Sequence, residues 1–217
     1  MTLFDPNSLG TVSRLVETSD GFVSVYVGRK RVGRVPEGKV QPLGITVGLE
    51  WTAELGERAA LALEVLRAKR KGVALLKVRG RSRGELRERL AGAGFAVRAV
   101  DGAIEELVAA RLLNDVALAE DGAAKALAKG MSASATRAGL QSRGVTAEDA
   151  GRAVERAGAG SELDRATEAV RNRLAKLPES LDAAGKWRRL MSALGRLGYE
   201  EETAREAVGR VLGFQDE

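Results

Sequence analysis

The stretch Leu90-Ala-Gly-Ala-Gly94-Phe95 decides the fold, because it recurs as Leu140-Gln-Ser-Arg-Gly144-Val145 and again as Leu194-Gly-Arg-Leu-Gly198-Tyr199. The glycines of successive copies are 50 and 54 residues apart. An apolar residue also stands ten positions after each glycine: Ile104, Val154 and Val208. A motif that recurs at this distance is typical of a protein built from stacked structural repeats.

Each copy of the motif reads as the end of a helix. The leucine falls in the last helical turn, and the glycine can adopt the left-handed conformation that closes the helix. Helix starts are predicted by three capping boxes and by Asp115 as a further N-cap. The boxes are Ser82-x-x-Glu85, Thr146-x-x-Asp149 and Ser161-x-x-Asp164. Three units of three helices then account for residues from about 73 to 213.

The first 55 or so residues have a different pattern. Val12 to Val16, Phe22 to Val27 and Val32 to Val35 are rich in β-forming residues, and Asp20-Gly21 between the first two favours a tight hairpin turn. We predict a short three-stranded meander that needs a helix for support. Within the helical part, Gly72 is predicted to be a weak point.

The predicted fold class is therefore mainly α. Three tandem three-helix repeats would form an elongated curved array, preceded by a short β-rich segment. The expected boundaries are 1–56 for the β-rich extension, 57–114 for a linking helix and the first repeat, and 115–160 and 161–217 for the second and third repeats.

The composition excludes most catalytic chemistry. The chain has no cysteine and no histidine, which removes thiol nucleophiles, imidazole bases and Cys/His zinc sites. No phosphate-binding Gly-x-x-x-x-Gly-Lys-Ser/Thr motif occurs. Carboxylate pairs such as Glu105-Glu106 occupy adjacent helix positions, which do not face each other. We predict no catalytic, cofactor or metal site and no small-molecule substrate, so the protein is not expected to be an enzyme.

The same reasoning bears on location. No stretch approaches the roughly 18 apolar residues of a membrane span. The opening segment Met1 to Pro6 lacks the basic and apolar regions of a signal peptide. We expect a soluble cytoplasmic monomer.

The charge is unevenly distributed along the chain. The net charge is +5, but residues 67–98 contain eleven Lys and Arg against two Glu, whereas residues 99–121 contain six Asp and Glu against one Arg. This asymmetry suits docking on a charged macromolecule. The plainer interpretation is a set of solvated helix faces held by mutual ion pairs.

Four segments resemble the RecX family of recombination regulators, in order and in spacing. They are Leu75 to Leu90 with its Arg-Ser-x-x-Glu-Leu core, Leu112 to Ala119, Leu140 to Val145, and Lys186 to Tyr199. The short β-rich extension also fits one version of the family. One departure is that the family commonly has Gly-Tyr where this chain has Arg111-Leu112.

The resemblance implies a regulator of recombination, DNA repair and the SOS response. It would bind in the groove of RecA–single-stranded DNA filaments and inhibit their extension, ATPase and strand exchange. The partner would be met by basic side chains, either at acidic patches on RecA or at phosphates of single- or double-stranded DNA. The candidate residues are Arg79, Arg81, Arg83, Arg87, Arg89, Arg137, Arg143, Lys186, Arg188 and Arg189.

Two other functions stay open at this point. One is a general DNA- or RNA-binding helical module without filament specificity. The other is an enzyme with a carboxylate site. Two Trp, two Tyr and four Phe are scattered through the chain, which argues against a dedicated single-strand binder that stacks bases on aromatic rings.

Overall fold

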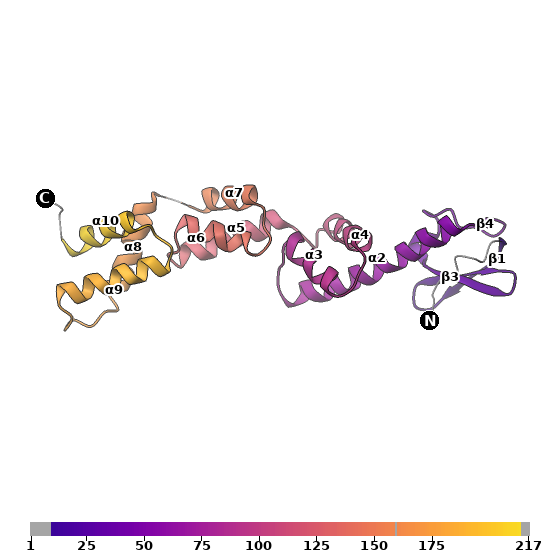
Figure 1. Cartoon of the computed structure of the whole chain (residues 1–217), viewed down its shortest axis with the longest axis horizontal. Helices are drawn as coiled ribbons and strands as arrows, with labels where there is room; N and C mark the ends of the chain where they lie inside the picture. Colours follow the sequence, from indigo (N-terminus) through magenta and orange to yellow (C-terminus); the bar gives the residue numbers. More distant parts are fainter. Residues whose placement is uncertain (1–9, 159, 214–217) are drawn as a thin grey trace. The chain divides into compact units, whose positions relative to one another are not determined.

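A four-stranded antiparallel sheet opens the described part of the chain (Figure 1). β1 (Gly10–Thr18), β2 (Phe22–Val27) and β3 (Lys30–Pro36) are the three predicted strands. The predicted meander omitted a fourth strand, β4 (Glu50–Trp51), which pairs with β1, so the strand order is β3-β2-β1-β4. A strand of two residues has no alternating pattern for sequence reasoning to detect.

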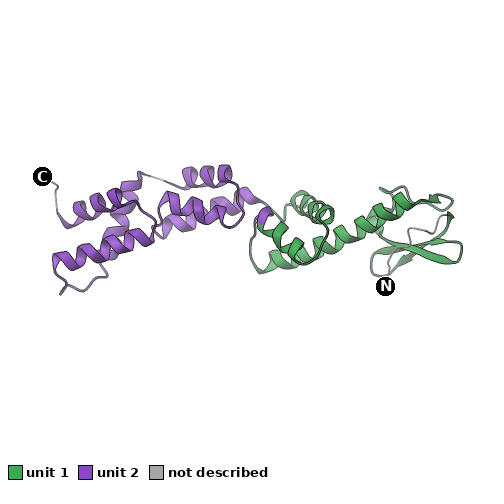
Figure 2. Cartoon of the chain, in the orientation of Figure 1, with its two compact units in different colours: residues 1–80, 85–113 green, residues 81–84, 114–217 purple. Residues whose placement is uncertain are grey.

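The computed structural model describes residues 10–158 and 160–213. The segment Met1 to Pro6, on which the expectation about a signal peptide rested, lies outside these residues. No helix in the described ranges has the length and apolar character needed to cross a membrane. The chain divides into two compact units (Figure 2): residues 1–80 with 85–113, and residues 81–84 with 114–217.

In unit 1 the sheet and a long helix share one apolar core. Val12, Val25, Val32 and Val35 are buried together with Trp51. The same core takes in the first turns of α2 (Ala53–Val78), whose N-cap Thr52 accepts a hydrogen bond from the amide of Leu55. Burial of these side chains, at about 25 cal/mol per Å² of apolar area, stabilises a sheet that would be marginal alone. A short helix, α1 (Glu37–Val40), follows β3.

Two further helices complete unit 1: α3 (Arg83–Gly92), which belongs to this unit from Glu85 onward, and α4 (Val97–Ala109). They bury Leu86, Leu90 and Leu107. Gly72, the predicted weak point, lies inside α2, which runs through it without a break. A Cβ at Gly72 would lie 2.9 Å from a methyl carbon of Leu107, so this glycine lets α2 and α4 approach closely.

Unit 2 contains two helical cores, each built mainly from Ala, Leu and Val. The first buries Leu140, Val145 and Val154, and the second buries Leu190, Leu194 and Val208. The helices are α5 (Asp115–Ala128), α6 (Ala133–Gln141), α7 (Ala147–Ala157), α8 (Glu162–Leu174), α9 (Ala183–Arg196) and α10 (Glu201–Leu212).

The three predicted helix endings are confirmed. Gly94, Gly144 and Gly198 have φ of +88°, +76° and +84°. In each copy the amide after the glycine donates to the carbonyl of the motif's leucine, at 3.4, 3.2 and 3.1 Å in chain order. This is the hydrogen bond that closes a helix through a left-handed residue.

The predicted helix starts are correct except for one residue. Thr146 and Ser161 cap α7 and α8, and Ser161 forms the full capping box with Asp164. Asp115 is not an N-cap: Asn114 takes that role, and its side chain accepts from the amide of Ala117. Asp115 is the first residue of α5, and its carboxylate accepts a hydrogen bond from the backbone amide of Arg83.

The start of α3 and the start of α6 are held in the same way within unit 2. The amides of Arg83 and Ala133, the first residues of the two helices, donate to carboxylates of Asp115 and Glu162, which begin the next helical hairpins. The N-cap residues add a second bond. Ser82 donates its hydroxyl to the carbonyl of Arg143 at 2.5 Å, and Ser132 donates its amide to the carbonyl of Leu197 at 2.9 Å. Both carbonyls immediately precede a closing glycine, so the two junctions share one design.

Candidate functional site

Ion pairs occupy most of the basic cluster that the sequence singled out. Arg79 forms two hydrogen bonds to the carboxylate of Glu85, at 3.0 and 2.5 Å. Arg89 lies 3.9 Å from the same carboxylate, and Arg87 pairs with Asp101 at 2.7 Å. Exposed pairs of this kind contribute little to stability, but they reduce the positive charge that the cluster offers to a partner.

The other two arginines of the cluster, Arg81 and Arg83, differ from each other in exposure. Arg81 is buried, with 8% of its surface exposed, so its side chain is part of the fold. Arg83 is exposed, and the carboxylates of Asp115 and Asp149 act on it electrostatically. For this cluster the plainer interpretation, helix faces with mutual ion pairs, describes the structure better than an open basic patch.

Asp115 accepts the Arg83 amide through both carboxylate oxygens, at 2.9 and 3.2 Å. Its position at the N-terminus of α3 places negative charge where the helix dipole favours it. Burial nevertheless raises the pKa of Asp115, because desolvation of the carboxylate outweighs the amide hydrogen bond and the nearby Arg83 charge. The carboxylate therefore acts as a structural acceptor.

The predicted cations of unit 2 are less neutralised. Arg137, Arg188 and Arg189 are exposed, and Arg143 and Lys186 are half-buried. Within residues 10–158 and 160–213 none of the five forms an ion pair. They remain candidates for contact with an anionic partner.

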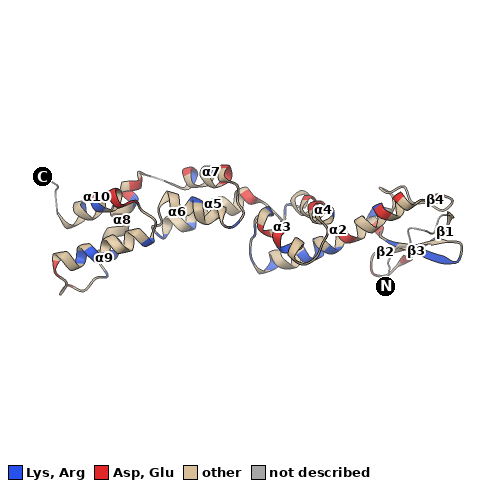
Figure 3. Ribbon diagram, viewed as in Figure 1, with Lys and Arg blue, Asp and Glu red and all other residues tan. Residues whose placement is uncertain are grey.

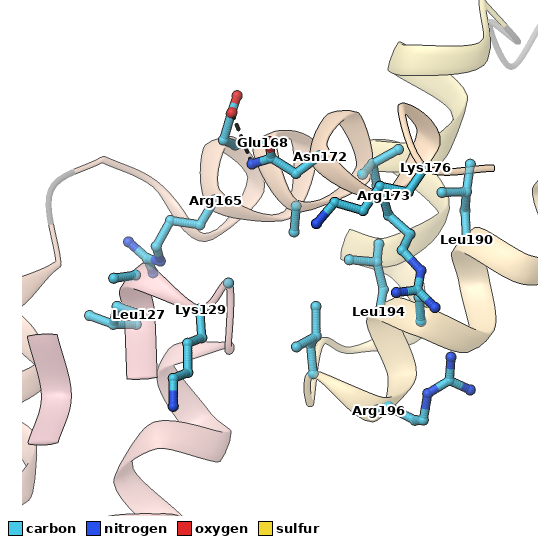
Figure 4. A pocket seen from close by; sticks show the side chains of 16 residues that line it. Leu127, Lys129, Arg165, Glu168, Asn172, Arg173, Lys176, Leu190, Leu194 and Arg196 are labelled. Atoms are coloured by element: carbon cyan, nitrogen blue, oxygen red, sulfur yellow. Dashed lines mark hydrogen bonds between the residues drawn. The ribbon is translucent and has the colours of Figure 1, made fainter. Parts of the chain in front are cut away.

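A basic cleft of about 580 Å³ lies between α8, α9 and the C-terminal end of α5 (Figure 4). Its floor is apolar and includes Leu127, Leu190 and Leu194. Five cationic side chains and one carboxylate line it: Lys129, Arg165, Arg173, Lys176, Arg196 and Glu168. We call this site the α8–α9 cleft. Its cations were missed by sequence reasoning, because the packing of three helices brings them together.

The α8–α9 cleft holds its charge with little internal compensation. Its one carboxylate, Glu168, is shared with Arg171 at 3.6 Å and with the side-chain amide of Asn172 at 3.1 Å. In the described part of the chain, Lys129, Arg173 and Lys176 make no ion pair. Apolar floor and basic rim together fit an acidic segment that also carries apolar side chains.

Arg165 is fixed at one end of the cleft. Its guanidinium donates to the carbonyl of Gly160 at 2.8 Å and to the carboxylate of Glu162 at 2.5 Å, while its Nε is buried without a partner among the described residues. An unpaired buried donor is unfavourable, and an acceptor that entered the cleft could satisfy it.

The predicted cations of α9 extend this site. Lys186, Arg189 and Arg196 stand at positions i, i+3 and i+10 of one helix, so they share a face. Arg196 lines the cleft, and Lys186 and Arg189 continue the same basic stripe toward the start of α9. Figure 3 marks the Lys and Arg positions along the α9 ribbon in blue.

The described residues offer no place for a metal ion. Residues 10–158 and 160–213 contain no group of three or more acidic side chains that could hold one. The α8–α9 cleft and the exposed cations of α9 offer positive charge beside apolar side chains.

Comparison with known proteins agrees with the sequence motifs. Residues 68–107 match the family model described as RecX, first three-helix domain. A solved structure described as regulatory protein RecX superposes with a TM-score of 0.70 at 16% identity, over 95% of this chain and 100% of that one. A second, RecX from Lactobacillus salivarius, gives a TM-score of 0.56 at 14% identity, over 71% and 99%. No curated protein matches the sequence significantly.

At these identities the two structures establish the fold, and the family model matches one segment of the chain, residues 68–107. The predicted mainly helical array behind a short β-rich segment is confirmed. The resemblance to the RecX family is confirmed as well: residues 68–107 match the model of its first three-helix domain, and the chain shares the fold of the two solved RecX structures.

Proposed function

We propose that this protein is a RecX-type, non-enzymatic regulator that binds RecA–single-stranded DNA filaments and inhibits their extension, ATPase and strand exchange. The observation that carries the proposal is the RecX first three-helix domain at residues 68–107, within a chain that has the RecX fold. It would act as a cytoplasmic monomer in recombination, DNA repair and the SOS response.

The surface that we assign to the filament is in unit 2. It comprises the α8–α9 cleft and the predicted cations without ion pairs, which are Arg137, Arg143, Lys186, Arg188 and Arg189. The apolar floor favours an acidic patch of the RecA protomer over bare phosphate, since DNA phosphates offer nothing to bury against leucines. The predicted residues Arg79, Arg87 and Arg89 would contribute less, because each is close to a carboxylate.

The first test is co-sedimentation with RecA filaments, compared with naked single-stranded DNA. We expect association with the filament, together with slower RecA ATP hydrolysis at a protein concentration well below that of RecA. Tight binding to bare DNA without any effect on RecA would contradict filament regulation and favour the general nucleic-acid module.

The second test locates the surface. Arg173→Gln with Lys176→Gln removes two unpaired charges from the cleft, and we expect filament affinity to drop about tenfold, or about 1.4 kcal/mol. Arg205→Gln with Arg210→Gln is the matched control. It removes two exposed α10 charges that are already paired within their helix. Equal affinities for the two double variants would remove the cleft from the proposal.

A further inference from the structure

One face of the N-terminal sheet combines arginines with an aromatic ring, a feature that the linear sequence conceals. In the register of the sheet, Tyr26 of β2 lies opposite Arg14 of β1 and opposite Arg31 of β3. Side chains of directly opposed residues share a face, so the three form a row with the aromatic residue in the middle. Adjacent strands are about 4.8 Å apart, which places the two arginine backbones about 10 Å from each other.

The row is already partly ordered. The Arg14 guanidinium lies over the Tyr26 ring, 4.3 Å from its centroid, in a cation–π contact. The hydroxyl of Ser13 donates to the carbonyls of Tyr26 and Gly28, at 3.2 and 2.9 Å, and so ties β1 to the beginning of the turn. A partner would therefore meet side chains whose backbone positions are fixed.

The adjoining turn adds more positive charge. Arg29, Lys30 and Arg31 are consecutive and exposed at the β2–β3 turn (Figure 3). In residues 10–158 and 160–213 neither Arg29 nor Arg31 forms an ion pair, and the same holds for Arg14. In the register of the sheet the acidic residues lie away from this row: Glu17 of β1 faces Val23, and Glu50 of β4 faces Thr11.

At the other end of the same sheet, a carboxylate neutralises the arginine that lies beside an aromatic ring. Arg34 donates to the carboxylate of Asp20 and lies 4.4 Å from the ring centroid of the buried Phe22. Arg70 of α2 reaches the same ring at 5.5 Å. That arginine–aromatic group is internal to unit 1, whereas the group around Tyr26 is open to solvent on its basic side.

We propose that Arg14, Tyr26 and the Arg29–Arg31 turn form a binding site for single-stranded nucleic acid. Arginine and lysine would neutralise the phosphates, and the ring of Tyr26 with its guanidinium partner would provide a flat surface for an unpaired base. A single strand fits better than an acidic peptide, because the site pairs dense positive charge with a π surface. The site does not depend on the proposed action on RecA.

The test is binding of a labelled oligothymidylate to the full chain in the absence of RecA. The triple variant Arg29→Gln, Lys30→Gln, Arg31→Gln should bind at least tenfold more weakly. The slope of log affinity against log salt concentration should become less steep by about 2. Each phosphate contact on a single strand contributes about 0.7 to this slope, and the variant removes three cations. The matched control removes three exposed cations elsewhere in unit 1: Lys71→Gln, Lys77→Gln and Arg98→Gln. An unchanged affinity in the triple variant, or an equal loss in the control, would overturn the site.

A second comparison separates stacking from charge. Tyr26→Leu should weaken binding by about fivefold or more, and Tyr26→Phe, which keeps the ring, should retain it. Circular dichroism establishes that each variant is folded. If Tyr26→Leu and Tyr26→Phe bind alike, or if duplex DNA is bound as tightly as the single strand, the assignment to an unpaired strand is wrong. Inhibition of RecA is measured separately with the triple variant. If the variant still inhibits RecA, the proposed function stands, whatever the oligothymidylate measurement shows about this site.

Discussion

The backbone amide of Arg83 donates to both carboxylate oxygens of Asp115, and this bond closes the start of α3 against α5 within unit 2. Because burial raises the pKa of Asp115, the folded state binds its proton more readily than the unfolded chain does. The contribution of Asp115 to stability therefore increases as the pH falls through the raised folded pKa, and decreases as the pH rises through it.

We expect Asp115→Asn to be at least as stable as the wild type at neutral pH, since the amide oxygen still accepts from Arg83 and no charge is buried. Urea unfolding at several pH values measures the free energy of unfolding of both proteins. The value for the wild type should rise relative to that of Asp115→Asn as the pH is lowered. Asp115→Ala leaves the Arg83 amide without its acceptor and should lose about 1–2 kcal/mol. If the wild type instead becomes less stable relative to Asp115→Asn as the pH is lowered, the inferred direction of the pKa shift is wrong.

Gly84→Ala should be strongly destabilising. Its Cβ would lie 2.8 Å from the carbonyl oxygen of Gly144 and 3.2 Å from its Cα, and backbone atoms cannot move aside as a flexible side chain can. Thermal unfolding should show a lower Tm. Gly92→Ala, at the end of the same helix, is the control, because nothing lies within 4 Å of its added Cβ. A similar Tm for both variants would show that the contact with Gly144 is not tight.

Arg111→Gly should stabilise the protein. Arg111 has φ of +56°, a left-handed conformation that strains a residue with a Cβ. It stands where the resemblance to the RecX family leads us to expect glycine. The relief of strain, about 1 kcal/mol, outweighs the extra freedom of glycine in the unfolded chain. Urea unfolding measures the difference, with Arg111→Ala as the control that removes the side chain but keeps the Cβ. Equal gains in both variants would assign the effect to charge instead of backbone conformation.

Glu106→Gln should destabilise unit 1 at neutral pH. Burial opposes ionisation of Glu106, but Lys39 at 2.7 Å and Lys69 at 2.9 Å outweigh it and hold the pKa of the carboxyl below its usual value. Stability from this group is present above the pKa of the unfolded chain and is lost as the pH falls through the lowered folded pKa. The wild-type advantage over Glu106→Gln in urea should therefore shrink in acid. An advantage that is constant with pH would rule out the charge as its source.

Arg137→Glu should weaken filament binding more than Arg87→Glu does. The two residues occupy equivalent positions in successive repeats, 50 residues apart, but only Arg87 has an ion-pair partner, Asp101. A charge without a partner does not have to give up a contact when it binds. Co-sedimentation with RecA filaments compares the two. The reverse order would argue that unit 1 carries the larger share of the interface.

The fold was predictable where its signals are local. A glycine that closes a helix needs only its own φ and the leucine four positions earlier, so the endings at Gly94, Gly144 and Gly198 could be predicted from spacing. Asp115 was wrongly predicted as an N-cap because Asn114 and Asp115 are both good capping residues, and only the packing of α3 shows which task each performs.

The candidate site was less predictable because it depends on tertiary packing. The ion pair of Arg87 with Asp101 joins residues on two different helices, so the sequence could show a basic cluster but not its neutralisation. The α8–α9 cleft draws Lys129, Arg173 and Arg196 from three helices, and no spacing rule connects them. In the same way, Arg14 and Arg31 meet on either side of Tyr26 only through the strand register.

The shared design of the two helix-start junctions has a consequence for the history of the gene. Arg83 and Ala133 each donate a backbone amide to the carboxylate that begins the next helical hairpin. Ser82 and Ser132 each donate to the carbonyl before a closing glycine, Ser82 through its hydroxyl and Ser132 through its amide. A tandem duplication of the DNA encoding one module would thus supply the donors at the helix start and their acceptors in the next module in a single event. We expect such chains to have grown in steps of about fifty residues, by copying a part that already fitted its neighbour.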